Sequence, residues 1–399
     1  MNFQLSDKAL RLSRRVNTFI HEHILPLEKE LLLDHQENAN WMEWQVDPRT
    51  EALKAKAKAE GLWNLFLPDL GCSNSDYVPI AEATGQSLLA AEIFNCNAPD
   101  TGNMEVLWKY GSAEQKAEWL QPLLDGKIRS AFCMTEPQVA SSDATNMQAS
   151  ITEKGDKIII NGTKWWSSGI GHPNCKVLIF MGLSDQEASR HRQHSMVLVP
   201  LDTKGVTIKR MLPVFGSYDA PYGHGEVVFD QVELPKSAII GGLGRGFEIA
   251  QGRLGPGRIH HCMRLIGAAE RALKMMIQRG MQRQAFSKPL LRLGGNVDVI
   301  ANARMNLDML RLLVQKTAWL LDTVGIKGAI SEVAQIKALA PKISCQIIDD
   351  AMQLFGGMGL SKDTVLSGLY AYARVLRLAD GPDEVHRAQV TRCELKKYK

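Results

Sequence analysis

The sequence contains no long run of apolar residues. Its longest apolar stretches, such as Val177–Leu183, fall far short of the roughly 20 residues that a membrane-spanning helix requires. It also contains no internal repeat and no low-complexity segment. Hydrophobic residues make up 45% of the chain and charged residues 23%, which is typical of a folded globular protein and excludes a disordered or collagen-like chain.

Cysteine is sparse and shows no pairing pattern. The seven cysteines are scattered and none forms a CxxC pair, so we expect neither a disulfide framework nor a zinc site of the usual kinds. The histidines form no HxxxH motif or mixed histidine–acid cluster, and we therefore expect no metal ion. Free cysteines of this kind are typical of a reducing compartment.

A strong excess of one charge is also missing, because the formal net charge is only +4 over 399 residues. Within this total, segment 251–292 holds nine lysines and arginines against the single acid Glu270. Such an excess suits phosphate-bearing ligands, which arginine can bind through two parallel hydrogen bonds. The segment has little aromatic content, so nucleic acid is not an expected partner.

Periodicity divides the chain into three zones. Helical spacing dominates up to about Arg129, and Ser112 with Gln115 resembles a capping box. Short β-branched stretches then predict antiparallel strands at 157–160, 177–181, 196–199, 206–211 and 226–229. Long helices are predicted at 301–324, 330–355 and 363–378, and the basic N-terminal segment is interpreted as a first core helix rather than a targeting presequence.

The predicted fold class is therefore α+β, mainly α. We expect an N-terminal helical domain at 1–130, a middle antiparallel β domain at 131–245, and a C-terminal domain of the four-helix-bundle type at 246–399. The glycine clusters at 242–246 and 356–359 lack Rossmann spacing and a following acid. Each could be a turn between helices, and the second could equally allow a ligand to approach the backbone.

Four segments resemble the acyl-CoA dehydrogenase family, in the family's order and across nearly the whole chain. They are FCMTEP at 132–137 with SSD at 141–143, INGTKWWSS at 160–168, RQAF at 283–286, and QLFGGMG at 353–359. The match is closest to the dehydrogenase part of two members that carry additional N-terminal domains, through the stretch FNCNAPDTGNME at 94–105. The resemblance implies the fold of helices, β domain and helices that the zones predict independently.

The resemblance implies FAD as the cofactor. Trp166 would lie over the flavin ring, although a strand tryptophan is more often a core residue, and Ser168 would donate a hydrogen bond toward flavin N5. Arg283 would bind the FAD pyrophosphate across a subunit interface, so a dimer or tetramer would share its FAD sites. The predicted cofactor-binding residues are Phe132, Met134, Thr135, Ser141, Ser142, Trp166, Ser167, Ser168, Arg283, Ala285, Gln353, Gly356, Gly357, Pro382 and Glu384.

The catalytic base of most family members is a glutamate followed by Gly-Thr near the end of the chain. The matching stretch is LADGPDEVH at 378–386, so Asp380 aligns with the base and Pro382 replaces the threonine. A helix-capping role is the alternative for Asp380, and Asp383 is the reserve candidate for the base. The predicted substrate-binding residues are Ser142, Arg258 and Gly381.

The resemblance implies dehydrogenation of a fatty acyl-CoA, with a long chain favoured, to a trans-2-enoyl-CoA. Electrons would pass to an electron transfer flavoprotein, in mitochondria or alternatively in peroxisomes. Because nitroalkane oxidases of this fold also use an aspartate, a flavin-dependent oxidase of nitroalkanes or acyl-CoA is an alternative function. A non-catalytic flavoprotein assembly factor is a further alternative, against which the presence of Asp380, Trp166 and Ser168 argues.

Overall fold

The computed structural model describes residues 4–33, 38–68 and 71–398. These residues divide into two compact units. Unit 1 is drawn from Met1–Glu30, Ala55–Phe94 and Gly257–Lys399, and unit 2 from Leu31–Lys54 and Asn95–Pro256. No described helix is both long enough and apolar enough to cross a membrane.

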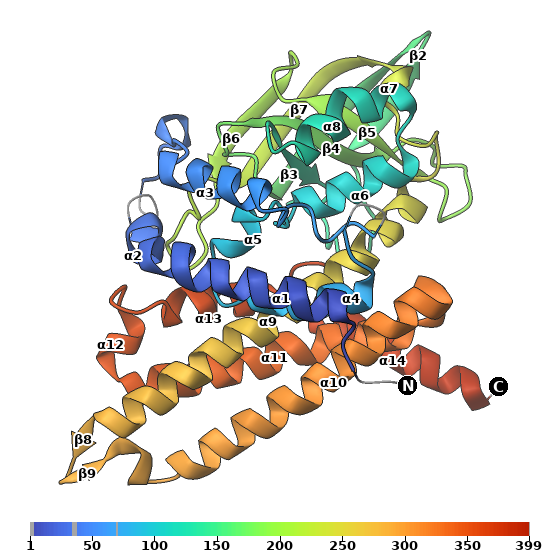
Figure 1. Cartoon of the computed structure of the whole chain (residues 1–399). Coiled ribbons are helices and arrows are strands. Elements are labelled where there is room, and N and C mark those ends of the chain that lie inside the picture. Colours follow the sequence, from blue (N-terminus) through green and yellow to red (C-terminus); the bar gives the residue numbers. More distant parts are fainter. Residues whose placement is uncertain (1–3, 34–37, 69–70, 399) are drawn as a thin grey trace. The chain divides into compact units, whose positions relative to one another are not determined.

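Helices occupy the first third of the chain (Figure 1). The first, α1 (Asp7–Phe19), starts where the Ser6 hydroxyl oxygen accepts the Ala9 backbone N–H, and it buries Leu12, Val16 and Phe19. The predicted capping box of Ser112 and Gln115 is confirmed. The other helices of this part are α2 (Leu25–Leu33), α3 (Pro48–Ala59), α4 (Asn74–Thr84), α5 (Ala90–Ile93), α6 (Asp100–Tyr110), α7 (Ala113–Gln115) and α8 (Gln121–Leu124).

A seven-stranded sheet forms the centre of unit 2. Its strands are β1 (Arg129–Cys133), β2 (Ser150–Lys154), β3 (Lys157–Ser168), β4 (Cys175–Leu183), β5 (His194–Pro200), β6 (Val206–Met211) and β7 (His224–Pro235). The order is β1-β4-β2-β3-β7-β6, with β5 paired to β4. All five predicted strands are present, and their pairings with one another, β3 with β7, β4 with β5 and β6 with β7, are antiparallel as predicted. The sheet also contains β1, which was not predicted and pairs with β4 in parallel. Parallel neighbours need a long connection, which a pattern of local strands does not reveal.

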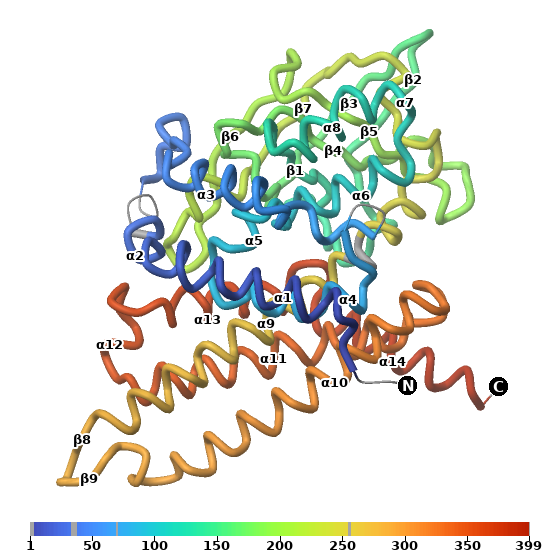
Figure 2. The backbone as a smooth tube through the Cα atoms, viewed as in Figure 1, coloured from blue at the N-terminus to red at the C-terminus, as the bar shows by residue number. Residues whose placement is uncertain are grey.

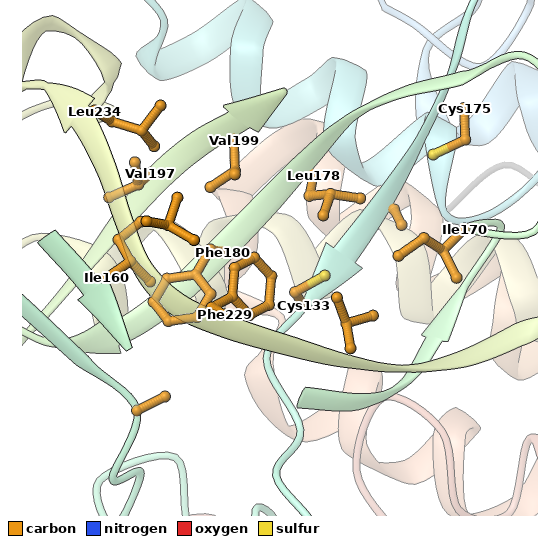
Figure 3. Close-up of a cluster of buried hydrophobic side chains, with 14 of the residues drawn as sticks. Cys133, Ile160, Ile170, Cys175, Leu178, Phe180, Val197, Val199, Phe229 and Leu234 are labelled. Atoms are coloured by element: carbon orange, nitrogen blue, oxygen red, sulfur yellow. The ribbon is translucent and has the colours of Figure 1, made fainter. Parts of the chain in front are cut away.

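One hydrophobic cluster of unit 2 lies on one face of this sheet. Alternate residues of paired strands project to the same side, and Figure 3 shows Phe180, Phe229, Ile160 and Cys133 meeting there. The Phe180 and Phe229 rings make an edge-to-face contact with centroids 4.8 Å apart. This packing anchors the ends of β1 and β3, from which the predicted flavin-binding segments emerge.

The C-terminal part is helical (Figure 2), as predicted. Its helices are α9 (Gly246–Gln282), α10 (Asn296–Gly328), α11 (Ile330–Phe355), α12 (Gly357–Leu360), α13 (Leu366–Val375) and α14 (Asp383–Leu395). A small hairpin of β8 (Gln284–Ala285) and β9 (Lys288–Pro289) joins α9 to α10. Gly356 has φ +66° and ends α11, in agreement with the turn interpretation of the second glycine cluster. The predicted three-zone fold class is confirmed.

Candidate active site

Asp380 lies in the short loop between α13 and α14 of unit 1. Its backbone is in the left-handed region, with φ +57°, and the next residue, Gly381, has φ +99°. A non-glycine residue in this region carries backbone strain, and such strain is concentrated at functional sites. The alternative helix-capping role is wrong, because the N-cap of α14 is Pro382 and no side chain caps that helix.

The Asp380 loop is held by three cationic or imidazole side chains. Arg258 Nε donates to the Asp380 carbonyl oxygen at 3.1 Å, and His386 Nε2 donates to the same oxygen at 3.2 Å. Lys337, fully buried in α11, donates from Nζ to the Leu376 carbonyl oxygen at 2.5 Å and to the Gly381 carbonyl oxygen at 3.5 Å. The backbone of the Asp380 loop is therefore fixed by side chains from α9, α11 and α14.

The Asp380 carboxylate faces His261 of α9. Its Oδ2 lies 3.7 Å from His261 Nε2, and about a fifth of its side chain is exposed. The reserve candidate, Asp383, differs in both respects. It is 4% exposed, and its Oδ2 accepts from Arg377 Nε and NH2, both at 2.8 Å. The Asp383 carboxylate is thus held in a nearly inaccessible ion pair with Arg377, so Asp380 is the better candidate for a proton acceptor.

His386, whose ring contacts the Asp380 loop, has a strongly lowered pKa. Burial, with the nearby charges of Arg258 and Lys337, lowers its pKa to about 4. The neutral ring must then carry its proton on Nε2, because the Asp380 carbonyl can only accept.

We expect acid to destabilise the fold through His386. When the pH falls below the ordinary pKa of histidine, His386 becomes protonated in the unfolded chain. In the folded chain it stays neutral until the pH reaches its lowered pKa of about 4. Up to about 3 kcal/mol of the free energy of unfolding is therefore lost between about pH 6.5 and pH 4. His386→Gln, which keeps a donor, should flatten this dependence in urea titrations at several pH values. The exposed His191→Gln is the control, and an equal slope in all three proteins would contradict the expectation.

In unit 2, the loop after β1 carries the first predicted flavin segment. Glu136 anchors this loop: its carboxylate accepts from Lys164 Nζ at 2.7 Å and from the backbone N–H groups of Gln148 at 2.8 Å and Ala149 at 3.0 Å. Lys164 also donates to the Met134 carbonyl oxygen at 2.8 Å. Both charged side chains are buried, at 0% and 2% exposure, and burial lowers the pKa of Lys164. A buried and fully bonded ion pair thus fixes both ends of the loop.

The second predicted flavin segment ends β3. Pairing of β3 with β7 is interrupted between Lys164 and Ser167, and Trp166 at this bulge has φ +53°. Trp166 is 42% exposed, so the alternative that it is a core residue is wrong. Ser168 Oγ lies 2.8 Å from His224 Nδ1, at the start of β7. A strained backbone therefore presents an aromatic face and a hydroxyl close to each other.

The other predicted cofactor residues fall into two groups. Near the β1 loop, Ser141 Oγ accepts the Glu136 backbone N–H at 2.9 Å and Ser142 is exposed, while the Arg253 guanidinium lies 4.0 Å from the Phe132 ring centroid. The second group belongs to unit 1 and lies at the hairpin, at the end of α11 and at the start of α14. Its exposed residues are Arg283, Gln353, Gly356, Gly357 and Glu384, and its partly buried residues are Ala285 and Pro382. Arg279 lies 5.5 Å from the Phe355 ring, which places the hairpin end of α9 beside the end of α11.

Each of these groups, taken by itself, has features that suit a part of a flavin dinucleotide. Trp166 offers an exposed aromatic face, and the indole N–H of neighbouring Trp165 is buried without a hydrogen-bond partner in the described structure. The open glycines at 356 and 357 allow close approach to the backbone, since an added Cβ at either would meet no atom within 4 Å. Exposed Arg283 is a suitable partner for a pyrophosphate.

Two residues of these sites were missed at the sequence level. His261 is not among the residues that the sequence motifs single out, although Arg258, His261 and Arg264 are spaced three apart and so share one face of α9. That spacing could have indicated its approach to Asp380. His224 is brought to Ser168 only by the pairing of β3 with β7, which no local pattern predicts.

Comparison with known proteins identifies the class. The N-terminal, middle and C-terminal domains of acyl-CoA dehydrogenases match residues 6–127, 131–232 and 244–395. The chain therefore belongs to the acyl-CoA dehydrogenase family, a family of flavin-dependent oxidoreductases, as its motifs predicted.

The more specific relatives agree with this assignment. The chain is 53% identical to acyl-CoA dehydrogenase family member 10 of Mus musculus over 98% of the chain, and 53% identical to member 11 of Gallus gallus over 98%. It spans only 37% and 51% of the lengths of these two proteins. A solved structure from Mycobacterium abscessus is 58% identical, with TM-score 0.97 and full coverage of both chains. A glutaryl-CoA dehydrogenase from Mycobacterium smegmatis, solved with FADH2, shares the fold at TM-score 0.81 and 21% identity, over 98% of this chain and 95% of its own.

Proposed function

We propose that the protein binds FAD and dehydrogenates a fatty acyl-CoA, with a long chain, to the trans-2-enoyl-CoA. The observation that carries this proposal is Asp380, a partly exposed carboxylate on a strained loop that Arg258, Lys337 and His386 hold at its backbone. Bound FAD would supply the acceptor for the hydride from the β carbon. Relatives described as acyl-CoA dehydrogenases support the substrate class.

The protein's own contribution is positioning and proton transfer. Asp380 would remove the proton α to the thioester carbonyl, and the fixed carbonyl oxygens on either side of it would keep the carboxylate at one distance from the substrate. Trp166 and Ser168 would contact the flavin ring, and the Glu136–Lys164 pair would hold the loop that carries Thr135 and Ser142. Arg258, predicted to contact acyl-CoA, uses its Nε on the Asp380 backbone, so its substrate contact stays a prediction.

An anaerobic flavin-reduction experiment tests the function. The purified protein is mixed with acyl-CoA esters of increasing chain length, and loss of visible flavin absorbance is followed. Reduction by long acyl-CoA, with reoxidation by an electron transfer flavoprotein and slow reoxidation by oxygen, is the expected result. Fast reoxidation by oxygen would instead favour an acyl-CoA oxidase, reduction by nitroalkanes a nitroalkane oxidase, and no reduction by any of these compounds an assembly factor.

The proposal extends to assembly and location. We propose a homodimer or homotetramer, because α10 exposes a row of apolar residues that a second copy could cover, among them Met305, Met309, Leu312 and Trp319. The family assignment leads us to propose a mitochondrial location, with peroxisomes as the alternative. Fractionation of cells that produce the protein would decide between these two.

Arg283→Ala is expected to weaken FAD binding by about 10- to 100-fold, since it removes charge-assisted hydrogen bonds to a pyrophosphate. Titration of the apoprotein with FAD measures the change, and sedimentation shows whether the oligomer persists. Lys288→Ala, which removes another exposed cation from the same hairpin, is the matched control. Equal FAD affinity in the wild type and the Arg283 variant would argue against a shared cofactor site.

A further inference from the structure

A line of polar side chains leads from the middle of α9 to the Asp380 carboxylate. Arg264 NH2 lies 3.2 Å from His261 Nδ1, and Tyr372 OH of α13 lies 3.4 Å from the same nitrogen. Arg264 Nε also donates to the Tyr372 oxygen at 3.3 Å. On its other side, His261 presents Nε2 to Asp380 Oδ2 at 3.7 Å.

The hydrogen-bonding capacities of these groups fix the position of the imidazole proton. Arginine has only donors and keeps its charge, so His261 Nδ1 must accept from Arg264. The Tyr372 oxygen accepts from Arg264, and the tyrosine hydrogen can share the single lone pair of His261 Nδ1 with the guanidinium. The neutral ring therefore carries its proton on Nε2, the nitrogen that faces Asp380.

At 3.7 Å the contact is longer than a hydrogen bond, but the partial positive charge of an N–H this close to a carboxylate favours its ionised form. The other charges that face Asp380 are those of Arg258 from α9 and Lys337 from α11, and the structure binds both of them to backbone oxygens of the loop. His261 approaches the carboxylate itself, with Nε2 3.7 Å from Oδ2. It is 13% exposed at the side chain, so its approach is determined by packing rather than by solvent.

We propose that His261 is a positioning residue for the base Asp380, held in the Nε2–H tautomer by Arg264 and Tyr372. The inference rests on the proposed function, because it assigns a role relative to the proton acceptor. If His261 has this role, the apparent pKa on the acid side of the profile of kcat/KM against pH depends on His261 as well as on Asp380.

The test compares His261→Leu, which offers no donor, with His261→Gln, which can accept from Arg264 and donate to Asp380. We expect kcat for the leucine variant to fall by about 10- to 100-fold with little change in KM, because the base is misplaced rather than removed. The acid limb of its kcat/KM profile should move to higher pH, because a carboxylate that loses a nearby N–H holds its proton more tightly. The glutamine variant should recover both quantities, and His191→Leu, at an exposed histidine, should alter neither.

Results are compared at equal FAD content, so that a folding defect is not read as a chemical one. Tyr372→Phe, a milder change, should shift the acid limb in the same direction by a smaller amount. Equal losses in the leucine and glutamine variants with an unmoved acid limb would overturn the positioning role while leaving the proposed function intact. Failure of the wild type to reduce its flavin with any acyl-CoA would instead overturn the proposed function and this role with it.

Discussion

Replacing Asp380 with asparagine is expected to slow flavin reduction by acyl-CoA about 10²- to 10⁴-fold while FAD remains bound. Asparagine has nearly the shape of aspartate and also tolerates the left-handed backbone found at this position, so the loop should keep its conformation. It cannot accept the substrate α proton. The loss should therefore fall on the chemical step.

Stopped-flow measurement under anaerobic conditions separates the two effects, since bound FAD is quantified from the oxidised spectrum before substrate is added. Asp363→Asn, which changes an exposed aspartate before α13, is the matched control and should reduce its flavin at the wild-type rate. Near-normal reduction in the Asp380 variant would refute the assignment of the base. Loss of FAD in that variant would show instead that Asp380 maintains the site.

Replacing Lys164 with methionine is expected to destabilise the protein by about 3–5 kcal/mol. Glu136 would remain buried at 2% exposure with two backbone N–H partners but without a cation. The loop between β1 and β2 would also lose the contact between Lys164 and the Met134 carbonyl oxygen, so FAD retention should fall with stability.

Denaturant titration of the apoprotein and of the FAD-loaded protein measures both effects. Lys157→Met is the matched control, because Lys157 belongs to the same strand but forms an exposed pair with Glu233, which contributes at most about 1 kcal/mol. The double variant Lys164→Met with Glu136→Gln should recover part of the loss, since no unpaired charge remains buried. An unchanged denaturation midpoint for the single variant would contradict a structural role for the pair.

The parts of the fold that were predictable are those with strong local patterns. The boundaries of α11 and β6 agree with the predicted 330–355 and 206–211, because each has a continuous period and a clear terminating residue. β1 was missed, since Arg129–Cys133 is short and acquires its strand conformation from a partner more than 40 residues away. Long-range pairing of this kind leaves little trace in a single sequence.

The site shows the same division. Asp380, Trp166 and Ser168 were identified by their place in motifs, whereas the side chains that surround them come from other elements. His224 meets Ser168 through a strand pairing, and Lys337 meets the Asp380 loop from α11. Motifs thus indicate candidates for the reacting residues, but the side chains that surround these candidates are determined by tertiary structure.

The left-handed backbone conformation of Asp380 limits which amino acids can occupy this position. Aspartate and asparagine occupy that region more readily than longer side chains do. A change to glutamate would therefore strain the backbone, besides extending the carboxylate by one methylene toward whatever it contacts. The loop held by Arg258, Lys337 and His386 has little freedom to relax. The aspartate at this position and the conformation of the loop thus depend on each other. Replacing the aspartate with glutamate would require a change in the turn as well.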